Sequence, residues 1–145
     1  MVIADDERAI FRGGGEIVMA NPNLHVLVVD DELLIRWSVA ETLSAAGHSV
    51  AQASDGRAAI AVLKAMPDID VVLLDYRLPD SDDLVLLGNI RRVVPDAAVV
   101  MMAAHGTTEM VEGALALGAQ RVITKPFDMQ DLESLVQTAH ASRSH

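Results

Sequence analysis

The stretch VVLLDYRLPD, residues 71–80, decides the fold, because four consecutive apolar residues end abruptly at Asp75. A short, continuous apolar run is typical of a strand that is buried on both faces of a parallel sheet. Other short apolar runs lie on both sides of it, and together they predict five strands. The predicted strands are residues 24–29, 49–53, 71–74, 98–103 and 121–124.

Longer segments of helical period alternate with these runs. The predicted helices are residues 33–46, 56–66, 84–94, 107–117 and 129–140. Gly47 and Gly118 follow two of them where a left-handed residue ends a helix, and Asp128 is a candidate N-cap of the last one. Strictly alternating strands and helices predict an α/β fold with a doubly wound parallel sheet, whose ligands bind beyond the carboxyl ends of the strands.

Composition indicates one domain with a substantial core, since 51% of the 145 residues are hydrophobic. The net charge of −10 argues against a nucleic-acid-binding surface, which needs clustered Lys and Arg. The absence of cysteine excludes disulfides and thiolate metal sites. We expect a cytoplasmic protein, because no apolar run is long enough to span or anchor in a membrane.

The domain is predicted to cover residues 23–141, after a flexible N-terminal extension, residues 1–22, and before a disordered tail, residues 142–145. The extension contains VIADDE at residues 2–7, which echoes LVVDDE at residues 27–32. We reject it as a rival acidic site, because a helix begun at Glu7 would reach three glycines after about one and a half turns.

Acidic residues and one lysine follow the predicted strands at the edge where their carboxyl ends meet. Asp30 and Asp31 follow the first run, Asp75 the third, and Lys125 the fifth. Carboxylates converging at one edge suit Mg²⁺, a hard cation that prefers oxygen ligands. Asp75, on a central strand, is the candidate nucleophile for a phosphorus centre, and Lys125 is the candidate partner of phosphoryl oxygens.

Each residue also has an ordinary structural interpretation. Asp30 and Asp31 could simply cap the helix that follows, without binding a ligand. Asp75 could be a strand-end turn residue, and Lys125 could be a solvated surface residue. The combination favours a site, because independent surface residues have no reason to follow the first, third and fifth strands in this way.

Four motifs in this order resemble the receiver domain of bacterial response regulators. They are LVVDDE at 27–32, VVLLDYRLPD at 71–80, MMAAHGT at 101–107 and GAQRVITKPF at 118–127. The sequences of these motifs are most similar to those of receivers attached to sigma-54-dependent activators. The resemblance implies the flavodoxin-like strand order 2-1-3-4-5 and a cis peptide bond between Lys125 and Pro126.

The resemblance also implies a chemistry. Mg²⁺ would be bound by Asp31, Asp75 and the main-chain carbonyl of Arg77, with Asp30 assisting. A sensor histidine kinase or a phosphotransfer protein would phosphorylate Asp75. The chain would then signal to a downstream protein or output domain, as a phosphoacceptor that assists its own phosphorylation and dephosphorylation rather than as an enzyme. No nucleic acid or membrane is implied as a partner, and a homodimer stays open.

The sequence departs from the family at the positions that usually transmit the switch. Ala103 stands where the family has Thr or Ser, and Val122 stands where it has an aromatic residue. Asp83 occupies a place that is commonly Gly. We expect three residues to flank the phosphoryl position: Arg77, Ala104 and His105. His105 and Arg77 either affect the access of the hydrolytic water or are ordinary loop residues.

Two alternatives remain beside the phosphorylated receiver, and the first of them follows from these departures. One is a binding module of the same fold that works independently of phosphorylation. The other is a Mg²⁺-dependent phosphohydrolase with an aspartyl-phosphate intermediate. We rank the hydrolase low, because Tyr76 and Arg77 follow the candidate nucleophile where a second acid would be needed.

Overall fold

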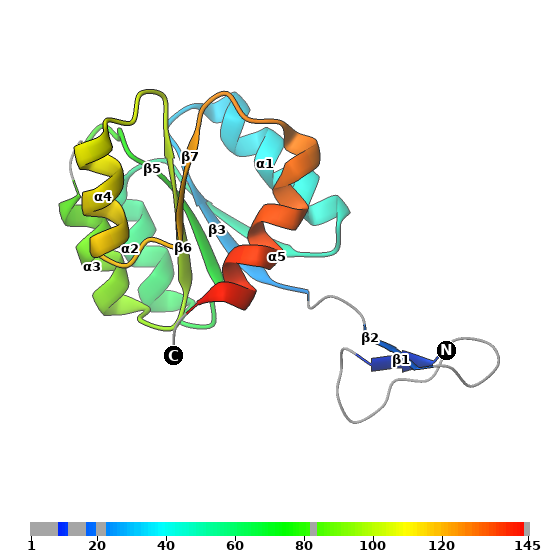
Figure 1. Ribbon diagram of the computed structural model, residues 1–145. Coiled ribbons are helices and arrows are strands. Elements are labelled where there is room, and N and C mark those ends of the chain that lie inside the picture. The colour runs from blue at the N-terminus through cyan, green and yellow to red at the C-terminus, as the bar shows by residue number, and fades with distance from the viewer. Residues whose placement is uncertain (1–8, 12–16, 20–22, 82–83, 144–145) are drawn as a thin grey trace.

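A five-stranded parallel sheet forms the centre of the molecule (Figure 1). The computed structural model describes residues 9–11, 17–19, 23–81 and 84–143. The strand order is β4-β3-β5-β6-β7, which is the predicted order 2-1-3-4-5 when the strands are counted from β3. The strands are β3 (His25–Val29), β4 (Ser49–Ala53), β5 (Val71–Asp75), β6 (Ala98–Ala103) and β7 (Arg121–Thr124).

Helices cover both faces of this sheet, so the predicted doubly wound fold is confirmed. α1 and α5 lie on one face, and α2, α3 and α4 lie on the other (Figure 1). The last predicted helix begins as a 3-10 turn, η1 (Met129–Asp131), which Asp128 caps by accepting from the Gln130 N–H. The helices are α1 (Leu33–Ala45), α2 (Gly56–Ala65), α3 (Val85–Val93), α4 (Thr108–Ala116) and α5 (Leu132–Ser142).

The central strand β5 is buried on both of its faces. Val72 and Leu74 pack in the cluster beneath α2, α3 and α4, whereas Val71 and Leu73 pack in the cluster beneath α1 and α5. Each such buried aliphatic side chain stabilises the fold by roughly 1.5–3 kcal/mol. This packing holds the end of β5, and therefore Asp75, in a fixed position.

The connections return the chain so that every strand ends at the same edge. Gly47, with φ of 97°, follows α1, and Gly118, with φ of 103°, follows α4. Asp55 caps α2 by accepting from the Ala58 N–H, and Thr107 caps α4 by accepting from the Met110 N–H. The predicted cis peptide bond between Lys125 and Pro126 is confirmed.

The N-terminal region contains an element that the sequence pattern did not predict. β1 (Ala9–Phe11) and β2 (Ile17–Met19) pair antiparallel in a separate two-stranded sheet. The rest of residues 1–22, including the VIADDE echo, lies outside the described residues, as do residues 144–145 of the predicted tail. α5 reaches Ser142, the first residue of that tail. No helix in the described part of the chain combines the length and apolarity that a membrane span needs.

Candidate functional site

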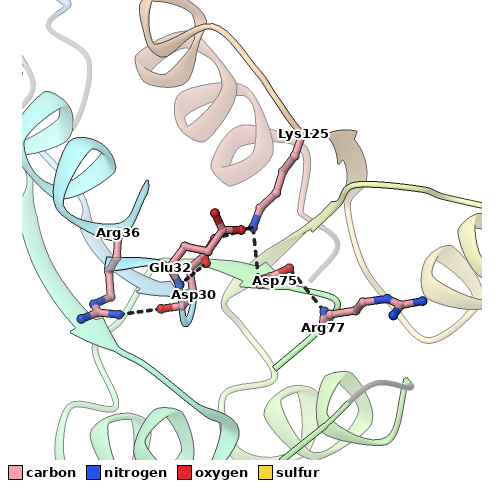
Figure 2. Close-up of polar contacts among 6 residues, drawn as sticks. All are labelled: Asp30, Glu32, Arg36, Asp75, Arg77 and Lys125. Carbon is pink, nitrogen blue, oxygen red and sulfur yellow. Dashed lines mark hydrogen bonds and ion pairs between the residues drawn. The ribbon is translucent and has the colours of Figure 1, made fainter. Parts of the chain in front are cut away.

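Lys125 lies among the carboxylates at the carboxyl edge of the sheet (Figure 2). Its Nζ is 2.6 Å from Asp30 Oδ2 and 3.1 Å from Asp75 Oδ2. Glu32 Oε1 lies 3.5 Å from the same ammonium. Residues at the ends of three different strands therefore meet at one point. The predicted strand order places Asp30, Asp75 and Lys125 together in this way.

Asp30 is completely buried, and each of its polar atoms has a partner. Its N–H donates to the Ala53 carbonyl at 3.1 Å, which joins the end of β3 to β4. Oδ1 accepts from the Glu32 N–H at 2.9 Å, and the carbonyl oxygen accepts from Arg36 Nη1 at 2.7 Å. With Lys125 on Oδ2, this buried carboxylate meets the requirement that buried charges be paired.

Asp75 is 6% exposed at the end of β5. Its Oδ1 accepts from the main-chain N–H of Arg77 at 3.3 Å, and its Oδ2 faces Lys125. The Arg77 side chain extends away from the carboxylates (Figure 2). The Asp75 carboxylate is therefore oriented by the backbone on one side and by a cation on the other.

The electrostatics of the cluster make ionised Asp75 costly without further positive charge. Burial, and then the charge of Asp30, raise the pKa of Asp75 to about 6, although Lys125 opposes this shift. For Lys125, burial acts to lower the pKa, but the hydrogen bonds and charges of Asp30 and Asp75 outweigh it and raise the pKa above its ordinary value. These contacts favour the charged form of Lys125, whose single positive charge is outnumbered by the carboxylates of Asp30, Glu32 and Asp75.

A cavity of about 390 Å³ opens above these side chains. Asp31 is exposed and lies on its wall, together with the predicted flanking residues Ala104 and His105. The full lining is Asp31, Glu32, Asp75, Tyr76, Arg77, Ala103, Ala104, His105 and Lys125. The structure therefore gathers every predicted site residue around one cavity except the buried Asp30, which lies beneath it, and Val122.

A larger cavity, of about 600 Å³, lies between α2 and α3, but its acid is already engaged. Asp80 accepts from the Gly56 N–H at 2.8 Å and from the Arg57 N–H at 3.0 Å. These bonds, first of all the one from Gly56, lower the pKa of Asp80. Asp80 is therefore engaged by the first N–H groups of α2, in addition to its N-cap Asp55, and the smaller cavity is the better candidate for chemistry.

The acids fit a hard divalent cation. Within the described ranges, Asp30, Glu32 and Asp75 each offer a carboxylate oxygen within 4.8 Å of the others. Such an all-oxygen donor set suits Mg²⁺, which also keeps several of its waters. The sequence analysis did not assign Glu32 as a candidate ligand, although its place directly after two acids was the available signal.

The predicted switch positions lack the usual groups. Ala103 is 3% exposed and contributes only a methyl group to the cavity wall. Val122 is half-buried and lies apart from the site, in a pocket of about 320 Å³ that Phe127 and Leu135 also line. Asp83 lies outside the described residues.

Comparison with known proteins identifies the family of the domain that contains this site. The sequence model of the response regulator receiver domain matches residues 26–137. The chemotaxis protein CheY of Treponema pallidum is 38% identical over 105 residues, which cover 71% of this chain and 73% of that protein.

Two further comparisons add a regulator and a solved structure. The DNA-binding transcriptional regulator NtrC of Salmonella typhimurium is 36% identical over 79% of this chain, and the match spans only 24% of NtrC. The CheX–CheY–BeF₃–Mg²⁺ complex of Borrelia burgdorferi is similar with a TM-score of 0.74 and 31% identity, over 79% of this chain and 87% of that one.

Proposed function

The chain belongs to the response regulator receiver domain family of two-component systems, and we propose that it accepts a phosphoryl group on Asp75. The observation that supports this proposal is the position of Asp75: it ends the central strand, opens into the cavity and faces Lys125. A sensor histidine kinase or a phosphotransfer protein would supply the phosphoryl group.

The chain's own residues account for most of the proposed transfer. A carboxylate oxygen of Asp75 forms a bond to phosphorus while the donor's bond to phosphorus breaks. The Arg77 N–H holds Asp75 Oδ1, so the carboxylate is oriented before the donor arrives. Lys125 then neutralises charge on the phosphoryl oxygens, which is the main task of a protein in phosphoryl transfer.

Mg²⁺ would be held by Asp75, Asp31 and the Arg77 carbonyl, with Asp30 assisting, and Glu32 is a further candidate ligand. The bound ion supplies positive charge that favours ionised Asp75 and the phosphoryl oxygens. The similar CheY of Borrelia burgdorferi was solved as a complex with BeF₃ and Mg²⁺, which supports a Mg²⁺ site in this chain. The group of three carboxylates from Asp30, Glu32 and Asp75 also supports an acidic cation site, but this group does not include Asp31.

The output would be protein binding rather than catalysis. Receiver domains act on partner proteins or on attached output domains, and the chain spans about a quarter of NtrC. We therefore treat the downstream partner as a protein surface or output domain, and the chain as a phosphoacceptor and not an enzyme.

A second function is a binding module that works without phosphorylation. The specific observation in its favour is Ala103, which brings no hydroxyl to the cavity wall. Val122 adds to it, because no aromatic side chain is present there to follow a moving hydroxyl. In this alternative the fold would bind its partner equally well whether or not Asp75 carries phosphate.

The decisive experiment is intact mass spectrometry after incubation with acetyl phosphate and Mg²⁺. Asp75→Asn and a chelator-treated sample test the two requirements, and Asp96→Asn is the matched control, because Asp96 is exposed near the start of β6 at the opposite edge. We expect one phosphate-sized adduct in wild type and Asp96→Asn only. If no adduct appears and phosphate is not released faster either, the phosphoacceptor proposal fails and the binding module stands.

A further inference from the structure

Arg36 lies beside the acidic cluster (Figure 2) and contacts three segments of the chain. It lies in the first turn of α1, where its N–H donates to the Glu32 carbonyl at 3.0 Å. Its guanidinium donates through Nη1 to the Asp30 carbonyl at 2.7 Å and through Nε to Gln52 Oε1 at 3.2 Å. The side chain thereby connects α1 to the ends of β3 and β4, yet it does not line the cavity.

The hydrogen bond from Arg36 to the Asp30 carbonyl also fixes the peptide bond that follows Asp30. That carbonyl belongs to the planar peptide unit that joins Asp30 to Asp31. A fixed carbonyl oxygen fixes the plane of this peptide. The orientation of the exposed residue Asp31, which follows the peptide, is thereby fixed as well. The buried Asp30 side chain is already held by Glu32 and Lys125, so Arg36 is the contact that orients the link to Asp31.

From this geometry we propose that Arg36 is a positioning residue for divalent-cation binding: it aims Asp31 into the cavity through the Asp30–Asp31 peptide. The inference rests on the proposed function, since it assumes that Asp31 contributes to a Mg²⁺ site. Contacts that orient ligands without touching the ion typically change metal affinity by about tenfold to a hundredfold when they are removed.

Two other roles for Arg36 predict different results. If Arg36 acted only through its charge, its removal would strengthen Mg²⁺ binding, because a positive charge near an acidic site repels a cation. If it only stabilised the fold, the affinity of the folded protein for Mg²⁺ would not change. Positioning alone predicts that binding weakens although a repelling charge has been removed.

Titration calorimetry with Mg²⁺ on the full chain separates these roles. We expect Arg36→Met to weaken Mg²⁺ binding by about tenfold, and Arg36→Lys, which keeps a donor for the Asp30 carbonyl, to recover most of the loss. Arg57→Met, at an exposed position on α2, is the matched control and should bind like wild type. Unchanged or tighter binding by Arg36→Met would overturn the proposal, as would a Lys variant as weak as the Met variant.

A measurement without metal keeps this inference separate from the proposed function. The Glu32 N–H donates to Asp30 Oδ1 within the turn that Arg36 is proposed to hold. Amide hydrogen exchange of Arg36→Met should show faster exchange at Glu32 than the change in global stability explains. If wild type fails to bind Mg²⁺, the metal assignment is wrong, whereas unchanged exchange at Glu32 refutes the role of Arg36 itself.

Discussion

Lys125 Nζ lies 3.1 Å from Asp75 Oδ2, and the two side chains are only 9% and 7% exposed. The residues are fifty positions apart in the chain: Asp75 is the last residue of β5, and Lys125 directly follows β7. Because both are nearly buried, the ion pair is poorly screened by solvent. The same ammonium that neutralises Asp75 in the resting protein is in place to meet phosphoryl oxygens on it.

Replacing Lys125 by Met should separate cation binding from phosphoryl transfer. The ammonium repels an incoming cation, so Lys125→Met should bind Mg²⁺ tighter, by about fivefold or more. Loss of charge stabilisation at the phosphoryl oxygens should slow phosphorylation by acetyl phosphate roughly a hundredfold. Calorimetry and the time course of adduct mass measure the two effects.

Lys64, the only other lysine, provides the control for this substitution. It is exposed in the last turn of α2, so Lys64→Met should change neither quantity. If Lys125→Met were phosphorylated at the wild-type rate, the lysine would be a structural partner of Asp30 and not part of the chemistry.

The raised pKa of Asp75 predicts a pH dependence of stability in chelator-treated protein. The carboxyl has a pKa of about 6 when folded, against 3.8 ordinarily, so the folded state holds its proton more tightly than the unfolded state. The resulting penalty is absent below the ordinary value, grows as the pH rises, and is complete above about 6. A shift of this size corresponds to about 3 kcal/mol at most.

Asp75→Asn should therefore gain stability relative to wild type as the pH rises. Urea unfolding should show the difference between the two free energies of unfolding increase by roughly 1–2 kcal/mol between about pH 5 and 7.5. Asp96→Asn serves as the control, because Asp96 is exposed. A difference that stayed constant over this range would mean that Asp75 ionises at its ordinary pKa.

The fold could be predicted because its determinants are local. The run at residues 71–74 is apolar at every position, and all four side chains are at most 1% exposed in β5. The acids and the lysine at the strand ends then followed from the topology alone, since parallel strands end at one edge. The roles of these residues in metal binding and phosphorylation stay predictions, because spacing along a chain does not show chemistry.

Arg36 could not be placed in the same way. Its partners depend on its side-chain direction within one helical turn, and on Gln52, which comes from a different strand. A helical period assigns Arg36 to a polar face, but it cannot say whether that face meets solvent or the end of a sheet. The β1–β2 pair was missed because the glycines of residues 13–15 indicated only that no helix forms there.

His48 is a buried residue whose loss should affect stability without touching the site. Its Nδ1 accepts from the Leu24 N–H at 2.8 Å, so the neutral ring carries its proton on Nε2, which contacts Glu133 of α5. The side chain is 1% exposed. His48→Ala should cost about 2–4 kcal/mol, because it leaves a cavity and removes the acceptor of a buried N–H.

Two variants identify the cause of that loss in urea unfolding. His48→Asn can still offer an acceptor to the Leu24 N–H, so it should lose less than His48→Ala. His25→Ala is the matched control, since the His25 side chain is 44% exposed, and it should change stability by less than about 0.5 kcal/mol. A His48→Ala variant as stable as His25→Ala would contradict the structural role.

Restoring a hydroxyl at position 103 should strengthen the switch. Ala103 lies on the cavity wall, and its strand partner is Thr124 at the end of β7. A Thr hydroxyl there could bond a phosphoryl oxygen, an interaction with a charged group worth about 1.5–3 kcal/mol. This bond would form only in the phosphorylated protein. It should therefore shift the equilibrium between the inactive and the active conformation of the receiver by the same free energy.

Nuclear magnetic resonance of residues 104–124, with and without beryllofluoride and Mg²⁺, measures this shift. We expect Ala103→Thr to show larger chemical-shift changes on activation than wild type. Ala103→Val is the matched control, because Val has the shape of Thr without its hydroxyl, and it should not exceed wild type. If both variants enlarge the response equally, side-chain volume and not the hydroxyl sets the size of the response.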